Sequence, residues 1–336
     1  MSESRFHVIA TSDPLYRVDV EAMRVALGDA ATVSEFSLPR ARVSGAELDR
    51  VVEALEQADG LLVRIGTLSR EIIERLPRLK VVALHGVGVD QVDVEAATEC
   101  GVYVTNVPGG NTPGVVELTV GLMIAMLRRI PAADRGLRTN HDWDGSRFLG
   151  SEIGSRTVGL IGYGNIARGV ARACQAFGAT VIATRRSRQT GSEDGVEIVS
   201  FDELVRRADV LSVHVPLNDE TRGMIDSSVF NRMKPGSYVV NVSRGPVVVQ
   251  DDLVAALKSG HLAGAALDVL ESEPPDFNSP LFTMDSVVIT PHMAGSSRES
   301  LATIARRASQ DILRVLKGQQ PLHAVNEPTT TPITPR

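Results

Sequence analysis

The chain of 336 residues has few cysteines and few lysines, the residues on which disulfide- or zinc-stabilised domains and many nucleic-acid binders depend. Its 2 cysteines, Cys100 and Cys174, cannot build a disulfide framework or a zinc site, so we expect no metal centre. Only 4 of its 35 cationic residues are lysines, and a formal charge of −6 argues against binding nucleic acid through a broad basic face. Because aromatic residues make up 4%, the core must be built from Val, Leu, Ile and Ala.

Long apolar runs are also missing. The longest candidate, residues 118–127, has 10 residues and ends at Arg128 and Arg129, whereas a helix that spans a bilayer needs about 20. The first ten residues show no basic segment followed by an apolar stretch, so we expect no signal peptide. The sequence therefore predicts a cytoplasmic protein without membrane contact.

What the chain does have is a repeated unit of a short apolar run, a turn and a helical pattern. Ser44 and Glu47, for example, form a capping-box pattern at the start of one predicted helix. The runs in the first third, each a predicted strand, are Phe6–Ala10, Thr32–Phe36, Gly60–Val63, Lys80–Leu84 and Val102–Thr105. Because these runs are apolar throughout rather than alternating, they predict a parallel sheet covered by helices on both faces.

The same pattern restarts in the second half of the chain. A long helix is predicted over residues 112–136, followed by an irregular stretch with the only tryptophan, Trp143. The second set of predicted strands is Thr157–Ile161, Thr180–Thr184, Val210–Val215, Tyr238–Val242, Ala263–Val269 and Val287–Thr290. Six strands with helices between them predict a second doubly wound parallel sheet, so the fold class is α/β with two such domains.

The domain boundaries follow from these two sets of strands. Residues 107–294 are predicted to form one domain. Residues 1–106 form another, to which the final helix returns, so that residues 295–325 belong to it. The Pro- and Thr-rich residues 326–336 are predicted to be a disordered tail.

A glycine-rich loop follows the first strand of the second set. It reads Gly162-Tyr163-Gly164-Asn165-Ile166-Ala167, a G-x-G-x-x-A pattern between a strand and a helix. Gly162 permits a tight turn, and Gly164 lets a pyrophosphate approach the backbone at the start of the helix. In this context the loop, with Asn165 and Ile166, predicts dinucleotide binding.

The residues after the next strand indicate which dinucleotide. An NAD site has an Asp or Glu about 20 residues beyond the glycines, for the ribose hydroxyls. Here the strand runs instead into Arg185, Arg186 and Arg188, with no carboxylate among them. Guanidinium groups bind phosphate through paired, charge-assisted hydrogen bonds, so the sequence favours NADP(H), with Arg185 as the main contact. A solvated basic turn, with NAD(H) as the cofactor, is the alternative.

Polar residues also follow the remaining strands of the second set. They are His214 and Pro216, Asn241 to Gly245, Asp268, and Pro291 and His292. Because the carboxyl ends of parallel strands meet at one edge of the sheet, these side chains are expected to gather where ligands bind. Arg, Asp and His in that row, with Glu273 nearby, predict a catalytic group of residues.

Taken together, these motifs resemble the D-isomer-specific 2-hydroxyacid dehydrogenase family. The resemblance runs from about residue 50 to 325 and also includes the stretch His85 to Asp90, Asn111-Thr112 and Asp268 to Pro274. It implies a Rossmann nucleotide-binding domain inserted in a flavodoxin-like substrate domain. It also implies a homodimer that pairs through the helix after residue 112 and the irregular stretch around Trp143.

The resemblance implies a catalytic set of Arg244, Glu273 and His292. Reduction of a 2-keto acid needs a hydride at the carbonyl carbon and a proton at its oxygen, and histidine is the natural proton donor near neutral pH. Glu273 would fix the tautomer of His292, with Glu271 as the rival carboxylate. Arg244 would hold the substrate carboxylate and polarise the carbonyl.

Further contacts are carried over residue by residue. In the first domain, the backbone N–H groups of Val87 and Gly88 are expected to bind the substrate carboxylate, and Arg64 to contact the substrate unless it is a surface arginine. His85 lies in the same stretch, with a structural role as its alternative. The other expected cofactor contacts are Thr112, His214, Pro216, Thr221, Val242 and Asp268.

The main hypothesis is therefore an NADPH-dependent reductase of small 2-keto acids such as glyoxylate and hydroxypyruvate. An NAD-linked 3-phosphoglycerate dehydrogenase is the alternative, which Arg185 disfavours. A corepressor-like protein that senses the dinucleotide is a more distant reading, and turnover of a small keto acid would exclude it.

Overall fold

The computed structural model describes residues 5–14, 16–187 and 190–328. The chain divides into two compact units, one made of residues up to Asn111 and from Ser296 onward, the other of Thr112–Gly295. The chain passes between them five residues later than the predicted boundary of 107, at the start of a helix. We call them the first and the second unit.

The first unit contains a parallel sheet of five strands in the order β2-β1-β3-β4-β5. This is the flavodoxin-like order. Its strands are β1 (Phe6–Thr11), β2 (Ala31–Phe36), β3 (Gly60–Val63), β4 (Val81–Leu84) and β5 (Tyr103–Thr105). Every residue of β3 and β4 is buried, as expected for strands covered on both faces.

Helices cover both faces of this sheet. They are α1 (Val20–Leu27), α2 (Gly45–Leu55), α3 (Arg70–Ile73), α4 (Val94–Glu99) and the C-terminal α11 (Arg298–Leu316). The last packs on β3, β4 and α1, so the chain returns to its first unit. Ser44 stands at the N-cap of α2 without a side-chain cap hydrogen bond, so the predicted capping box does not form as such.

Residues after α11 add a strap along β5, one of the two edge strands of this sheet. Asn326 is buried, and its side chain accepts a hydrogen bond from the Val104 N–H (2.7 Å) and donates to the Val102 carbonyl (3.0 Å). Ala324 pairs with Thr105 in an antiparallel bridge. The tail predicted to be disordered from residue 326 is therefore ordered at Asn326, because its amide satisfies backbone groups of β5. Residues 329–336 lie outside the described part of the chain.

The second unit contains an eight-stranded sheet in the order β13-β12-β11-β10-β6-β7-β9-β8. Its strands are β6 (Thr157–Ile161), β7 (Thr180–Thr184), β8 (Gly191–Glu193), β9 (Val196–Ile198), β10 (Val210–Val213), β11 (Ser237–Asn241), β12 (Leu262–Leu267) and β13 (Val287–Ile289). The parallel core runs outward in both directions from β6, which is the Rossmann arrangement. The predicted fold class is thus confirmed for both sheets.

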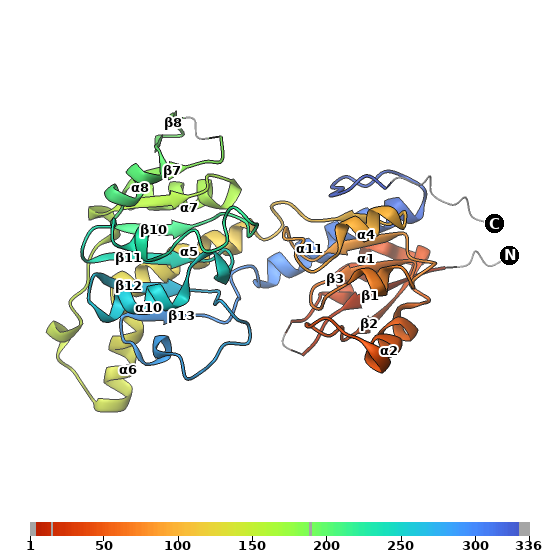
Figure 1. Cartoon of the computed structure of the whole chain (residues 1–336), viewed down its shortest axis with the longest axis horizontal. Coiled ribbons are helices and arrows are strands. Elements are labelled where there is room, and N and C mark those ends of the chain that lie inside the picture. The colour runs from red at the N-terminus through yellow and green to blue at the C-terminus, as the bar shows by residue number, and fades with distance from the viewer. Residues whose placement is uncertain (1–4, 15, 188–189, 329–336) are drawn as a thin grey trace. The chain divides into compact units, whose positions relative to one another are not determined.

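The sequence did not predict the antiparallel hairpin β8–β9 at one end of this sheet (Figure 1). Asp194 and Gly195 connect its strands with φ angles of +53° and +73°. A two-residue turn with both φ angles positive matches the right-handed twist of the strands, and Asp-Gly is one of its preferred sequences. Val196 and Ile198 are buried in the core and anchor the hairpin.

The helices of the second unit are α5 (Thr112–Leu127), α6 (Ile130–Asn140), α7 (Asn165–Ala176), α8 (Phe201–Arg207), α9 (Ser227–Phe230) and α10 (Gln250–Lys258). The single long helix predicted over 112–136 is wrong, since the chain forms α5 and α6 instead. Arg129 adopts a left-handed conformation (φ +54°) that ends the first helix, and Pro131 suits the first turn of the next. In the described part of the chain, no helix has the length and apolar character needed to cross a membrane.

Candidate active site

The glycine loop lies between β6 and α7, as predicted. Gly162 has φ +90°, and a Cβ there would lie 3.0 Å from the His214 carbonyl oxygen, so the turn leaves no room for a side chain. A Cβ at Gly164 would meet nothing within 4 Å, so the backbone is open on that side. Asn165 and Ile166 begin α7, where first-turn N–H groups have no acceptor within the helix. This cradle fits a dinucleotide pyrophosphate.

Arg185 follows β7 directly beside this loop. The last register pair of the two strands is Ile161 with Thr184, so Gly162 and Arg185 leave the sheet side by side. Arg185 Nη1 donates to Glu193 Oε2 at 3.1 Å. The residues directly after β7 hold no carboxylate, as the sequence shows, yet the fold brings one to Arg185. Glu193 is eight residues further along the chain, and the hairpin folds it back.

The two other predicted arginines differ from Arg185. Arg186 is highly exposed and lies 3.7 Å from Glu220, an ion pair that contributes little in water. Arg188 lies outside the described residues. Of the two arginines that the structure describes, Arg185 is the half-buried one.

The remaining predicted cofactor residues lie at the carboxyl ends of strands in the second unit, or at the start of α5 in the case of Thr112. Thr221 donates from its hydroxyl to the Pro216 carbonyl at 2.6 Å, so it holds the loop after β10 in shape. His214 Nε2 lies 2.9 Å from Ser212 Oγ, and burial lowers the pKa of His214 to about 4. His214 is consequently neutral at pH 7. Val242 follows β11 and is buried.

His292 and Glu273 form the central pair of the site. His292 Nδ1 lies 2.7 Å from Glu273 Oε2, and Glu273 Oε1 accepts from the Leu270 N–H at 3.3 Å. Glu273, rather than its rival Glu271, is therefore the paired carboxylate. Burial raises the pKa of Glu273, but the hydrogen bond and charge of His292, the Leu270 N–H and the charge of Arg244 together bring it below its usual value. An ionised carboxylate only accepts, so the proton of a neutral His292 sits on Nδ1 and Nε2 is left for the reaction.

A buried carboxylate shapes the loop that carries His292. Asp268 is 1% exposed and accepts hydrogen bonds from Thr290 Oγ1 (2.6 Å) and from the N–H groups of Met293 and Ala294 (both 2.9 Å). Its carbonyl accepts from the His292 N–H at 2.7 Å. His292 adopts φ +51°, which non-glycine residues rarely do. The Asp268 side chain thus binds the Thr290 hydroxyl before His292 and two backbone N–H groups after it, a role that the sequence did not reveal.

Arg244 is brought to the same region by a tight turn. Its Nη1 donates to the Ser243 carbonyl at 2.9 Å, and Asn241 Nδ2 donates to the Arg244 carbonyl at 3.0 Å. A Cβ on Gly245 would lie 1.8 Å from the Leu270 carbonyl oxygen. The turn therefore presses against the backbone that leads to Glu273, and any residue but glycine at position 245 would force the two apart. The structure brings all three predicted catalytic residues into one region of the second unit.

The predicted substrate residues of the first unit follow β3 and β4. Arg64 Nη1 lies 2.9 Å from His85 Nδ1, and its Nη2 donates to Ser296 Oγ at 3.1 Å. Burial and the charge of Arg64 lower the pKa of His85 to about 3, so His85 is neutral and accepts from the guanidinium. Arg64 is thus fixed by partners within its own unit. Val87 is 47% exposed and its carbonyl accepts from Asn106, while Gly88 follows it in the same loop.

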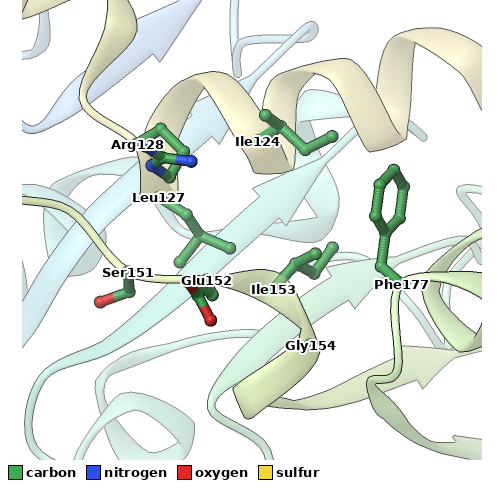
Figure 2. Close-up of a pocket in the computed structure, with 8 residues that line it drawn as sticks. All are labelled: Ile124, Leu127, Arg128, Ser151, Glu152, Ile153, Gly154 and Phe177. Carbon is green, nitrogen blue, oxygen red and sulfur yellow. The ribbon is translucent and has the colours of Figure 1, made fainter.

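A pocket of about 280 Å³ lies elsewhere in the second unit. Figure 2 shows the side chains of Ile124, Ile153 and Phe177 around a common space. The lining residues are Ile124, Leu127, Arg128, Ser151, Glu152, Ile153, Gly154 and Phe177. None of them is a predicted catalytic, cofactor or substrate residue, so this pocket is separate from the site described above.

The fold and these residues define a dinucleotide-binding α/β protein with a histidine–carboxylate pair at the ends of its strands. The family model for "D-isomer specific 2-hydroxyacid dehydrogenase, NAD binding domain" matches residues 120–294. The chain belongs to the D-isomer specific 2-hydroxyacid dehydrogenase family, and the resemblance found in the sequence is confirmed.

Individual relatives carry two different names. A D-3-phosphoglycerate dehydrogenase of Archaeoglobus fulgidus is 37% identical over 314 residues, which are 90% of this chain and 59% of that protein. The chain therefore spans little more than half the length of this curated relative. A glyoxylate reductase of Thermococcus litoralis is 35% identical over 85% of this chain and 88% of that protein. The crystal structure of a glyoxylate reductase from Paecilomyes thermophila covers 96% of this chain and 99% of its own, with a TM-score of 0.83 and 27% identity.

Proposed function

We propose that the protein is an NADPH-dependent reductase that converts a small 2-keto acid, glyoxylate or hydroxypyruvate, into the D-2-hydroxy acid. The observation that carries this proposal is the pair of His292 Nδ1 and Glu273 Oε2 at 2.7 Å, on a loop fixed by Asp268 at the carboxyl edge of a Rossmann sheet. The second unit is the nucleotide-binding domain in this proposal, and the first is the substrate domain.

The residues have separate tasks. A dinucleotide held at Gly162, Gly164, Asn165 and Ile166 would supply the hydride for the carbonyl carbon. His292, as the imidazolium, donates the Nε2 proton to the carbonyl oxygen, and Glu273 holds the ring and stabilises its charged form. Arg244 pairs with the substrate carboxylate and polarises the carbonyl. In the reverse direction neutral His292 accepts the proton at the same atom.

In the first unit, we assign Arg64 and the N–H groups of Val87 and Gly88 to the substrate carboxylate. Arg64 already has His85 and Ser296 as partners, which hold its guanidinium in one orientation. A guanidinium that is held in place loses less entropy when it binds an anion.

The preference for NADPH is supported by Arg185. It leaves the sheet beside the glycine loop, at the place where NAD sites carry a carboxylate on the strand end. A guanidinium there offers charge-assisted hydrogen bonds to a 2′-phosphate. The other cofactor residues of the proposal are those predicted from the sequence, with Gly162, Gly164, Asn165 and Ile166 at the pyrophosphate.

The test is a set of initial rates with glyoxylate, hydroxypyruvate, pyruvate and 3-phosphohydroxypyruvate, each with NADPH and with NADH. Saturable turnover of a small keto acid, faster with NADPH, is the expected result. Equal kcat/KM values with the two dinucleotides would contradict the cofactor assignment, and no turnover of any keto acid would contradict the reaction.

A second candidate is an NAD-linked 3-phosphoglycerate dehydrogenase. It is favoured by the identity of 37–41% with proteins of that name, against 35–36% with glyoxylate reductases. The same set of rates decides, because this enzyme would prefer 3-phosphohydroxypyruvate and NADH.

We also propose a homodimer formed through the second unit. Its exposed large apolar side chains include Trp143 and Leu149, both 83% exposed, Ile130 (51%) and Leu137 (42%), all on α6 or next to it. Apolar groups of this size in solvent favour contact with a second copy of the chain. Light scattering should give the mass of a dimer at micromolar concentration, and Trp143→Glu should lower that mass; a monomer mass for the unaltered chain would contradict the proposal.

A further inference from the structure

Glu193 binds two arginines at the edge of the proposed cofactor site. Its Oε2 lies 3.1 Å from Arg185 Nη1, and its Oε1 lies 2.6 Å from Arg168 Nη2. All three side chains are about one-third exposed. The arginine assigned to the 2′-phosphate therefore already has an anionic partner within the protein.

The hairpin holds this carboxylate in place. Glu193 is paired with Val196 next to the Asp194-Gly195 turn, and Val196 is fully buried. Since the turn is short and its neighbouring strand is anchored in the core, the backbone of Glu193 is fixed. Only its side chain is free to change partners.

Arg168 connects the hairpin to the glycine loop. Its guanidinium stacks on the ring of Tyr163, with Cζ 4.6 Å from the ring centroid, and its Nη1 lies 3.1 Å from Asp194 Oδ2. Its N–H donates to the Gly164 carbonyl at 2.9 Å. Glu193 is thus linked through Arg168 to the two residues that precede α7, and through Arg185 to the end of β7.

We propose that Glu193 is a specificity-determining residue that competes with the 2′-phosphate of the dinucleotide for Arg185. This inference rests on the proposed NADPH function. A phosphate that pairs with Arg185 takes the place of Glu193 Oε2, while Glu193 Oε1 keeps Arg168. Each NADPH that binds must therefore break one ion pair and tolerate a carboxylate nearby, whereas NADH needs neither.

The consequence is a preference for NADPH that is weaker than Arg185 alone would give. A unit charge next to a phosphate dianion in a half-exposed site weakens binding by about 5- to 20-fold. Glu193 thus lowers the affinity for NADPH below the value that Arg185 and the glycine loop would give without it.

The test measures binding directly, with two nucleotides that differ in the 2′-phosphate. Dissociation constants of 2′,5′-ADP and 5′-ADP are determined by calorimetry for the unaltered protein and for Glu193→Gln. The glutamine keeps the size of the side chain and removes its charge. We expect 2′,5′-ADP to bind about 5- to 20-fold more tightly to the variant and 5′-ADP to change less than 2-fold.

The hairpin supplies a matched control. Glu197 lies on β9, opposite Ser192, and pairs with Arg207 at 2.6 Å rather than with Arg185. Glu197→Gln should leave both dissociation constants unchanged. Thermal melting of both variants checks that the hairpin still folds.

Several outcomes would overturn the proposal. Unchanged or weaker binding of 2′,5′-ADP by Glu193→Gln would show that Glu193 does not compete, and equal tightening of both nucleotides would show a general change in charge. Arg185→Gln separates this inference from the proposed function. If it lowers the affinity for 2′,5′-ADP but not for 5′-ADP, Arg185 reads the phosphate whatever Glu193 does. If it changes neither, the NADPH assignment itself fails.

Discussion

Two side-chain pairs of the candidate site, Glu273 with His292 and Glu193 with Arg185, are built differently. Glu273 and His292 lie on loops fixed by a carboxylate that is 1% exposed and by a glycine that leaves no room for a Cβ. Glu193 and Arg185 are about one-third exposed at the end of a hairpin. The first pair is held in one geometry, which suits the proton transfer that we propose for it, and the second is more open to solvent, which suits the exchange of partners that we propose for it.

The largest effect is expected when the histidine of the Glu273–His292 pair is removed. His292→Ala should lower kcat by roughly 10²- to 10⁴-fold, because it removes the proton donor. Steady-state rates with the best keto acid measure the effect. His261→Ala is the control, since His261 binds the Phe230 carbonyl of the same unit and should be neutral for kcat. Near-normal turnover by the first variant would remove His292 from the mechanism.

Substitution in the Glu193–Arg185 pair should have a smaller effect on kcat/KM, and only with NADPH. Arg185→Gln should lower kcat/KM for NADPH by about 10- to 100-fold, the range for a lost charged hydrogen bond, and change that for NADH little. The ratio of the two constants is the measurement. An unchanged ratio would mean that Arg185 does not recognise the 2′-phosphate.

Substitution of Asp268 tests whether the Glu273–His292 pair depends on the loop that Asp268 holds in place. Asp268→Asn keeps the shape but gives an N–H₂ group where the loop needs an acceptor, so Met293 or Ala294 loses its hydrogen bond. We expect kcat to fall about 10-fold and the thermal midpoint to fall with it, since an unsatisfied buried N–H costs about 1–3 kcal/mol. A direct role at the dinucleotide would instead appear mainly as a higher KM for NADPH.

His214 differs from the histidine of the Glu273–His292 pair, because burial alone lowers its pKa. Its pKa is about 4 in the folded protein, whereas an unfolded histidine titrates near 6.5. The unfolded state therefore binds the proton first, so stability falls as the pH drops from 6.5 towards 4. At pH 5 this loss is about 2 kcal/mol relative to pH 7. His214→Gln should show a correspondingly smaller loss in denaturant unfolding, and an identical pH dependence would contradict the assignment.

Most of the fold could be predicted from the sequence, because continuous apolar strands between helices leave few arrangements. The predicted strands of both sheets agree with the observed ones within about two residues. The long helix over 112–136 was wrong because Arg129 adopts a conformation that nothing in its own side chain requires. Asp194-Gly195 is a usable hairpin signal, but both flanking strands have only three residues and the first, β8, has no apolar residue, so the alternation that normally accompanies the signal is short and one-sided.

The candidate site could also be predicted only in part. His292, Glu273 and Arg244 follow strands of one sheet, so the topology alone predicts that they gather. The contact of Glu193 with Arg185 depends on how a hairpin folds back, and the role of Asp268 depends on backbone N–H groups that carry no side-chain signature. Both are properties of the tertiary structure, and residue types alone do not reveal them.

The strap of residues 323–326 along β5 has a consequence for the behaviour of the protein in solution. β5 is the last strand of its sheet, and an open edge of this kind presents unpaired N–H and carbonyl groups to other chains. Val325 donates to the Val104 carbonyl at 2.8 Å, and Asn326 accepts from the Val104 N–H. The strap thus closes the edge by which copies of the chain would otherwise stack into aggregates.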